Sequence, residues 1–213
     1  MYVNIHSHTV INSNIQGIRN LTFSEANIIY ISKIRGLYSV GFHPWYADTC
    51  SDELMNKMNE WLTDDRFVAV GECGLDKNSK VSIEEQLNVF DQQIKLSEKV
   101  HKPLIIHCVG CFNELLELKK NLHPSQQWII HGFRGKPELA RQAIRAGCGL
   151  SFGEHFNEES VRITPIDQIF IETDESQIPI SNLYHNISMI KNCKAEDLIA
   201  GENLIKSMTR HKT

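Results

Sequence analysis

Short apolar runs separated by longer segments of mixed polarity recur along most of this chain. Eight runs of strand length lie at residues 2–5, 15–23, 36–42, 66–70, 103–106, 127–130, 148–152 and 168–171. Short, nearly continuous apolar runs of this kind are typical of strands that are buried on both faces of a parallel sheet. The pattern therefore predicts a parallel sheet with covered faces.

Most segments between these runs carry apolar residues at helical spacing. We expect helices at residues 51–62, 83–100, 112–120, 137–146, 182–191 and 195–208. Two of them are expected to begin with a capping box, Thr49 with Asp52 and Ser82 with Glu85. Residues 24–35 are ambiguous, because 28–31 could form a strand. Only about five residues would then separate it from the next strand, and a parallel crossover needs about a dozen. A short helix or irregular crossover is therefore expected there.

The alternation of strands and helices predicts an α/β fold, a (β/α)8 TIM-type barrel. The chain has 213 residues, 41% of them hydrophobic and 23% charged, which suits a globular protein. It shows no internal repeat, low-complexity segment or linker, so residues 1–213 are expected to form a single domain.

Histidines and carboxylates follow the predicted strands with unusual regularity. In a (β/α)8 barrel the active site lies where the C-terminal ends of the strands converge. His6 and His8, two residues apart at the end of one strand, can point the same way. Imidazole and carboxylate groups are ligands for divalent metals, so these residues predict a metal site. The candidates at strand ends are His6, His8, His43, Glu72, His107, His131 and Asp174.

Several segments around these residues resemble the TatD-like metal-dependent hydrolases, usually described as deoxyribonucleases, within the amidohydrolase-type barrels. The matching segments are His6-Ser7-His8, Gly41-Phe42-His43-Pro44, Gly71-Glu72-Cys73-Gly74-Leu75-Asp76, Pro103-Leu104-Ile105-Ile106-His107-Cys108, His131-Gly132-Phe133-Arg134-Gly135 and Glu172-Thr173-Asp174. Gly201-Glu202-Asn203 resembles the family's terminal helix.

The resemblance implies two divalent metal ions per chain, zinc, magnesium or manganese. One ion would be held by His6, His8, Glu72 and Asp174, and the other by Glu72, His107 and His131, with Glu72 bridging them. Two ions can grip the attacking and leaving oxygens of a phosphate ester and activate a water molecule. Asp174 would orient that water or take its proton, so Asp174 and Glu72 are the expected catalytic residues.

Three further residues are expected to contact substrate. His43, by resemblance and position, would face the substrate rather than a metal. Trp45 could stack on a base or sugar, or close the core at the rim of the barrel. Arg134 belongs to a basic group with Lys136, Arg141 and Arg145, which could bind phosphate or form an ordinary charged helix face.

The expected activity is that of a metal-dependent hydrolase of phosphodiester bonds, a TatD-like deoxyribonuclease acting on DNA or on a small phosphodiester. The alternative is a hydrolase of a small amide, ester or lactone on the same metals. The net charge of −4 gives no general attraction to nucleic acid or to an anionic membrane. A third possibility is a non-catalytic relative. The presence of every expected metal ligand argues against it.

Two departures from the family pattern carry their own expectations. Asn4 stands where the family usually has aspartate, which puts metal affinity at the first site in question, because an amide cannot raise the basicity of an imidazole as a carboxylate can. The stretch between His8 and Gly36 is shorter than the family norm. We expect this shortened first crossover region to leave a flank open or covered by a neighbouring subunit of a homo-oligomer.

The remaining features have ordinary interpretations. Cys108 and Cys111 match a CxxC redox or zinc motif, but small buried thiols are the preferred reading. We interpret the other histidines as surface or loop residues; they are His101, His123, His155, His185 and His211. No apolar run is long enough to span a bilayer and no leader pattern is evident, so a cytoplasmic protein without membrane contact is expected.

Overall fold

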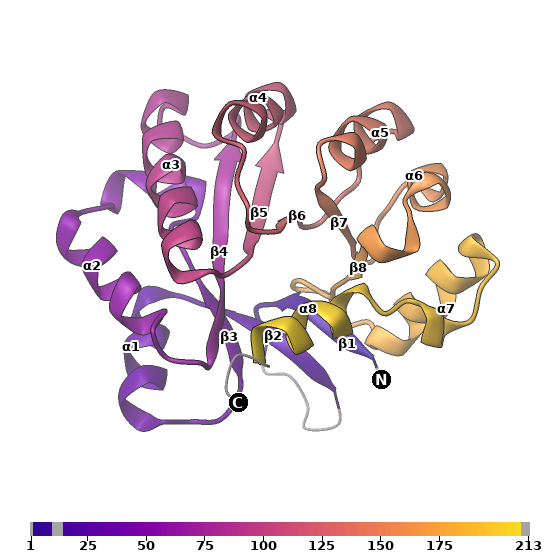
Figure 1. The fold of residues 1–213 in the computed structure, drawn as a ribbon, viewed down its shortest axis with the longest axis horizontal. Helices are drawn as coiled ribbons and strands as arrows, with labels where there is room; N and C mark the ends of the chain where they lie inside the picture. The colour runs from indigo at the N-terminus through magenta and orange to yellow at the C-terminus, as the bar shows by residue number, and fades with distance from the viewer. Residues whose placement is uncertain (1, 10–14, 210–213) are drawn as a thin grey trace. The chain divides into compact units, whose positions relative to one another are not determined.

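Strands and helices alternate along the chain in the computed structural model, which describes residues 2–9 and 15–209 (Figure 1). The described residues fall into two compact units. Unit 1 contains residues of the ranges 1–19 and 129–213, and unit 2 contains residues 20–128. The expectation of a single domain stays a prediction.

Unit 2 is built on three parallel strands in chain order. They are β3 (Leu37–Val40), β4 (Phe67–Asp76) and β5 (Leu104–Val109). The unit also holds the end of β2 (Gln16–Leu21) and five helical segments, α1 (Phe23–Ser32), the 3₁₀ helix η1 (Pro44–Thr49), α2 (Asp52–Trp61), α3 (Ile83–Val100) and α4 (Phe112–Leu122). The helix α3 packs along β4, as Figure 1 shows.

The strand β4 is longer than the sequence pattern predicts. The predicted strand ended at residue 70, but β4 continues to Asp76 and every residue in it is buried. Its last residues pair with β5, Gly74 beside His107 and Asp76 beside Val109. Gly74 permits this pairing because a Cβ atom there would lie 2.1 Å from the carbonyl oxygen of His107. The glycine-rich motif is therefore part of the sheet and carries Glu72 and Asp76 on one strand.

The ambiguous segment at residues 24–35 forms a helix, α1. Thr22 and Glu25 make a capping box at its N-terminus. At its C-terminus, the Arg66 guanidinium donates hydrogen bonds to the carbonyl oxygens of Ile29, Tyr30 and Ile34. Of these three residues, Tyr30 lies in the last turn of α1, where carbonyl groups lack partners within the helix.

The two predicted capping boxes have different outcomes. Ser51, not Thr49, caps α2, with its hydroxyl accepting from the backbone N–H of Leu54. The helix begins two residues later than the Thr49 pairing requires, so that prediction is wrong. Ser82 accepts from the N–H of Glu85 at the start of α3, as expected for the serine of the box.

Unit 1 is built on parallel strands that bring the last strand of the chain beside the first. They are β6 (Trp128–Ile130), β7 (Gly149–Phe152), β8 (Ile169–Ile171), β1 (Val3–Ser7) and the start of β2. The first residue of β6, Trp128, belongs to unit 2. The strand β7 pairs with β6 and with β8, and β1 pairs with β2. A parallel bridge between Ser7 and Asp174 joins the ends of β1 and β8. Adjacent first and last strands are what a barrel requires.

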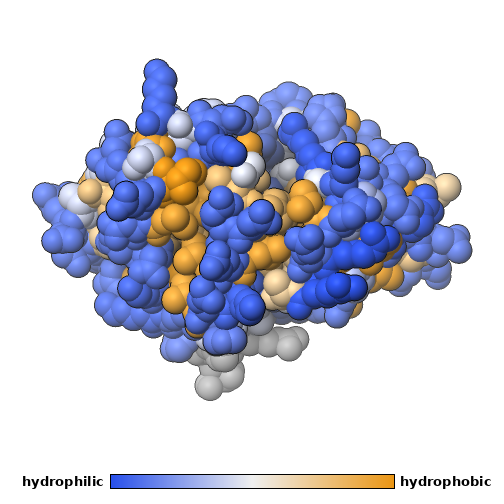
Figure 2. Space-filling view, turned by 90° about the horizontal axis from the view of Figure 1, so that it is seen from above, coloured by the Kyte–Doolittle hydropathy of each residue, from blue (hydrophilic) through white to orange (hydrophobic). Residues whose placement is uncertain are grey.

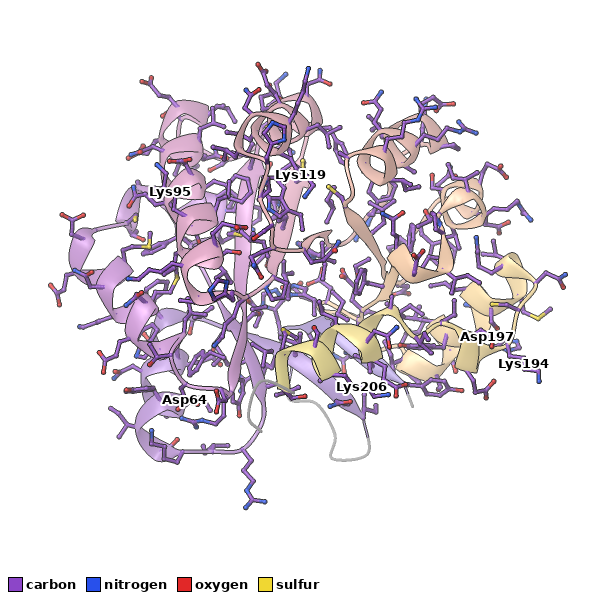
Figure 3. All side chains as sticks on the ribbon, viewed as in Figure 1. Asp64, Lys95, Lys119, Lys194, Asp197 and Lys206 are labelled. Atoms are coloured by element: carbon purple, nitrogen blue, oxygen red, sulfur yellow. The ribbon has the colours of Figure 1, made fainter. Side chains whose placement is uncertain are left out.

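The helical segments of unit 1 differ from the prediction in two places. They are α5 (Pro137–Arg145), α6 (Glu158–Ile163), η2 (Ile166–Gln168), α7 (Ile180–Lys191), η3 (Ala195–Asp197) and α8 (Ala200–Thr209). The short α6 and η2 were not predicted. The single helix expected at residues 195–208 is wrong, because Leu198 leaves the helical backbone region and separates η3 from α8. Lys194 and Asp197 lie together at this turn, where the Lys194 N–H donates to the Asp197 carboxylate (Figure 3).

Apolar side chains fill the core of each unit, including Phe67 and Phe90 in unit 2 and Ile5 and Phe152 in unit 1. The face shown in Figure 2 is mainly hydrophilic, with smaller apolar areas between the charged side chains. In residues 2–9 and 15–209, no helix is both long and apolar enough to cross a membrane.

Candidate metal centre

In unit 2, one histidine from each of two neighbouring segments faces the carboxylate of Glu72. The Glu72 Oε1 atom lies 2.8 Å from Nδ1 of His107 and 3.3 Å from Nε2 of His43. Ligand atoms of the three residues all lie within 4.8 Å of one another. Two imidazoles and a carboxylate at this spacing suit a divalent cation such as zinc or manganese.

Side-chain amides hold this cluster in place. The Asn20 Oδ1 atom accepts from the backbone N–H of Glu72 at 2.8 Å. The side chain of Gln93, on α3, accepts from the N–H of Phe42 and donates to its carbonyl oxygen. Gln93 thereby fixes the backbone next to His43. The Nδ1 atom of His43 accepts from the N–H of Trp45, so Nε2 is the nitrogen that faces Glu72.

A second carboxylate, Asp76, contacts His107 at the ring nitrogen that does not face Glu72. Its Oδ2 atom lies 3.0 Å from Nε2 of His107 and accepts from the indole N–H of Trp45 at 2.7 Å. Its Oδ1 atom accepts from the N–H of Asn78 at 2.8 Å. Burial pushes the pKa of Asp76 upward, but the hydrogen bonds from Asn78, Trp45 and His107 outweigh it, so the pKa lies below its ordinary value.

Cys111 of the CxxC pair lies in surroundings that disfavour a thiolate. Cys111 is buried at the start of α4, and burial, with the nearby charge of Glu114, raises the pKa of its thiol. Reactive cysteines need a lowered pKa, because the thiolate is the nucleophile. No disulfide involving Cys108 or Cys111 is present in the described chain. The preferred reading as small buried thiols fits Cys111, whereas Cys108 is half-buried.

In unit 1, the two histidines of the first strand face Asp174. The Asp174 Oδ1 atom lies 3.6 Å from Nε2 of His6 and 3.5 Å from Nε2 of His8. The ligand atoms of the three residues lie within 4.8 Å of one another. His6 is fully buried, whereas the side chains of His8 and Asp174 are about one-third exposed, at 37% and 34%. Solvent and substrate can therefore reach this group from one side.

The backbone around Asp174 is bonded directly to the first strand. Its N–H donates to the carbonyl of His6, and its carbonyl accepts from the N–H of His8. Asp174 has φ of +52°, in the left-handed region that few residues other than glycine adopt. Aspartate tolerates this region better than most residues, and such outliers concentrate at functional sites.

The side chain of Asn4 forms its hydrogen bonds with Thr173 and not with a histidine of the described residues. Its Nδ2 atom donates to Oγ1 of Thr173 at 2.8 Å, and its Oδ1 atom accepts from the N–H of Thr173 at 3.1 Å. The residue that departs from the family pattern therefore supports the backbone next to Asp174. These contacts do not support a direct effect of Asn4 on the basicity of an imidazole.

His131 follows β6 and lies beside another buried carboxylate. The Glu172 Oε1 atom accepts from the N–H of Gly132 at 2.7 Å and lies 3.3 Å from Nδ1 of His131. If Nδ1 donates to Glu172, Nε2 is the nitrogen whose lone pair can bind a metal, the usual arrangement for a metal-binding histidine. The rings of His131 and His6 are 4.4 Å apart between centroids, so His131 belongs to the same cluster.

A cavity of about 300 Å³ in unit 1 adjoins Asp174. Arg134 and His155 line it, together with the carboxylates of Glu154, Glu172, Asp174 and Glu175. Four carboxylates against one arginine would repel a phosphate group. Bound divalent cations would offset this excess of negative charge, so the residues present fit a metal-dependent site.

Each predicted metal ligand thus lies in a cluster within its own unit. Those of unit 1 are His6, His8, His131 and Asp174, and those of unit 2 are Glu72 and His107. Arg134 lines the cavity, and Trp45 lies beside His43 with 5.1 Å between ring centroids. His43, expected to face substrate, offers a ligand atom to the unit 2 cluster.

Sequence reasoning missed three residues at these clusters. Asp76 and Glu172 lie inside the matched motifs, one at the end of the glycine-rich segment and one two residues before Asp174, and this placement was the available signal. His155 is exposed as expected for a loop residue, yet it lines the cavity. His211 lies outside the described residues.

Comparison with known proteins links this arrangement to one family. The family model described as TatD related DNase matches residues 9–193. An uncharacterized metal-dependent hydrolase of Buchnera aphidicola is 30% identical over 74% of this chain and 64% of its own length. A protein of Cronobacter sakazakii named 3'-5' ssDNA/RNA exonuclease TatD is 27% identical over 74% of this chain and 67% of its own length. The chain spans a little under two thirds of the Buchnera relative.

A solved structure shows the same fold. The crystal structure of a TatD homologue from Escherichia coli K12 aligns with a TM-score of 0.83 and 18% sequence identity, covering 97% of each chain. This likeness, together with the eight strands of the described chain, confirms the expected (β/α)8 TIM-type fold.

Proposed function

Because the chain belongs to the TatD family of metal-dependent hydrolases, we propose that it hydrolyses phosphodiester bonds of nucleic acid, as a divalent-metal-dependent deoxyribonuclease. The observation that carries this proposal is the joining of His6, His8 and Asp174 beside a cavity that also contains Arg134. The names of relatives as exonucleases support nucleic acid as the substrate class.

We propose the ligand sets that the family resemblance implies. Glu72 would serve both ions, since a carboxylate has two oxygens to offer. His6, His8 and Asp174 would complete one set, and His107 and His131 the other. Bound divalent ions would supply Lewis acidity toward the phosphate and lower the pKa of water. Zinc, magnesium and manganese are all compatible with imidazole and carboxylate ligands.

The residues of this chain would then divide the remaining work. The partly exposed carboxylate of Asp174 would take the proton of the attacking water at one of its oxygens. Arg134, exposed at the cavity, can donate paired hydrogen bonds to a phosphate. Trp45, 54% exposed, offers a ring face for a base, and His43 would lie next to that base or its phosphate.

The test is hydrolysis of a short single-stranded DNA, labelled at either end, by metal-free protein with magnesium, manganese or zinc added. The proposal predicts cleavage that a chelator abolishes and that Asp174→Ala lacks. Asp167→Asn, an aspartate of η2 outside both clusters, is the matched control. Full activity in Asp174→Ala would remove that residue from the mechanism.

Failure of DNA cleavage by protein with bound metal would instead favour the alternative of a small-molecule hydrolase. The same metal-loaded protein would then be assayed on amide, ester and lactone substrates. Cleavage of one of these together with inert DNA would overturn the nuclease proposal while keeping the metal centre.

Self-association and a cytoplasmic location stay predictions. The helix α1, in the shortened region, exposes Ile28 and Ile31, and the exposed Ile34 follows just after the helix. Sedimentation of the purified protein at several concentrations would show whether a second copy associates with it. A monomer at all concentrations would contradict the homo-oligomer expectation.

A further inference from the structure

One buried carboxylate in unit 2, Asp76, joins the proposed metal ligand His107 to the exposed ring of Trp45. We propose that Asp76 is a positioning residue that fixes both side chains, so that metal binding and stacking of substrate are coupled through it. This inference rests on the proposed metal role of His107.

The position of His107 between two carboxylates decides which nitrogen can bind a metal. Nδ1 faces Glu72 at 2.8 Å and Nε2 faces Asp76 at 3.0 Å. A neutral imidazole has one N–H and one nitrogen with a free lone pair. The proposal assigns the N–H to Nε2, where Asp76 accepts it, and the lone pair of Nδ1 is then directed to the side of Glu72. Carboxylates that orient metal-binding histidines in this way commonly raise metal affinity.

Asp76 is itself held rigidly. Its backbone N–H donates to Oε1 of Gln86, and its carbonyl accepts from Nε2 of Gln86. The N–H of Asn78 fixes its Oδ1 atom, and its side chain is almost fully buried. These bonds fix the position of the Oδ2 atom, which contacts both His107 and Trp45.

Trp45 combines exposure with a fixed orientation. More than half of the residue is exposed, yet its indole N–H donates to Asp76 Oδ2 at 2.7 Å. The bond holds the ring edge against the protein and leaves ring surface accessible. Because Trp45 and His107 share one oxygen atom, a change at His107 on metal binding alters the hydrogen bond that orients Trp45.

Replacing Asp76 by asparagine separates this role from a merely structural one. Three donors, on Asn78, Trp45 and His107, converge on the two carboxylate oxygens, and an amide offers only one oxygen. With the amide NH₂ toward His107, Nε2 must accept and Nδ1 must carry the proton, so the ligand lone pair is lost. With the amide reversed, its NH₂ opposes the N–H of Asn78. In either orientation the site for His107 is impaired.

The experiment is a zinc titration of metal-free protein. Calorimetry measures the zinc affinity, and tryptophan emission in the presence of the quencher acrylamide measures the response of the accessible ring. Trp61 and Trp128 are buried, so the quencher-accessible emission reports Trp45. We expect Asp76→Asn to weaken zinc affinity about 10- to 100-fold. Zinc should change the accessible emission of the unaltered protein, and this response should be lost in Asp76→Asn. Asp91→Asn is the matched control, because this α3 carboxylate pairs with the exposed Lys95. Lys95 is labelled in Figure 3.

The outcomes separate the two proposals. An unaltered protein that binds no divalent metal would contradict the proposed function. Zinc binding of equal strength in the unaltered protein and Asp76→Asn, with the same emission response, would overturn the role of Asp76 alone. If Asp76→Asn does not fold, nitrogen NMR of the zinc-loaded unaltered protein decides the question. Protonation of His107 at Nε2 is expected, and protonation at Nδ1 would overturn the inference.

Discussion

Asn4 and Thr173 are joined by two hydrogen bonds, one from Asn4 Nδ2 to Thr173 Oγ1 and one from the Thr173 N–H to Asn4 Oδ1. Aspartate at position 4 could accept from the same N–H and from the Thr173 hydroxyl, which can act as a donor. We therefore expect Asn4→Asp to change zinc affinity less than threefold in calorimetry. A gain of tenfold or more would show that residue 4 acts on a metal ligand after all.

Asn4→Ala should destabilise the protein instead. The buried N–H of Thr173 would lose its acceptor, at a cost of about 1 to 3 kcal/mol in the free energy of unfolding. Denaturant unfolding measures this loss. An unchanged midpoint and slope would mean that water replaces the amide at no cost.

Glu172→Gln should weaken metal binding through His131. The Glu172 Oε1 atom accepts from Gly132 and faces His131, while Oε2 is buried and has no hydrogen-bond partner in the described residues. A glutamine would place an unsatisfied NH₂ at one of these positions. We expect zinc affinity to fall about 10- to 100-fold, as is usual when a residue that hydrogen-bonds to a metal ligand is replaced. Glu175→Gln, an exposed residue of the same cavity, is the control, and equal effects of the two changes would contradict this role of Glu172.

Asp64 should make stability depend on pH. Its hydrogen bonds with Arg66, which caps α1, hold the pKa of Asp64 well below its usual range, against the opposing effect of burial. The unfolded chain therefore binds the proton first as pH falls. The stabilising contribution is complete above the ordinary aspartate pKa of about 4 and is lost below it.

Urea unfolding of Asp64→Asn between pH 6 and pH 3 tests this linkage. At pH 6 the variant should be less stable by about 1 to 3 kcal/mol, the usual loss for a hydrogen bond to a charged group. The difference from the unaltered protein should shrink toward pH 3. A difference that stays constant over this range would show that Asp64 does not carry the acid sensitivity. Asp64 lies after α2 and is labelled in Figure 3.

Arg134 and Lys136 should set part of the salt dependence of DNA binding. Both are exposed on the segment between β6 and α5, and Arg134 lines the cavity. Neutralising both to glutamine should weaken binding and reduce the slope of log affinity against log salt by about 0.7 per lost phosphate contact on single strands. Arg141→Gln, which pairs with Glu138 on α5, is the control. An unchanged slope in the double variant would exclude these residues from phosphate binding.

The positions of the metal candidates could be predicted because they depend on a simple regularity. Residues that end parallel strands meet at one edge of a sheet, so His6 and Asp174, at the ends of β1 and β8, were expected together without any knowledge of register. The contact between them follows from the neighbouring backbone bonds.

The partners of these residues could not be predicted in the same way. Asp76 meets His107 only because β4 continues past the glycines and its register on β5 shifts by one residue between Val70 and Cys73. Nothing in the pattern of apolar residues marks such a shift, since the whole strand is buried. The capping role of Ser51 in place of Thr49 depends likewise on a two-residue difference in where α2 begins.

The most direct test of the proposed centre is the metal content of purified protein, compared with Glu72→Ala and Asp174→Ala. If Glu72 serves two ions, the unaltered protein should hold about two equivalents of metal, Asp174→Ala should keep at least the second ion, and Glu72→Ala should hold none. Elemental analysis after dialysis gives these numbers, with unfolding curves to show that each variant is folded. Two equivalents retained by folded Glu72→Ala would contradict the account.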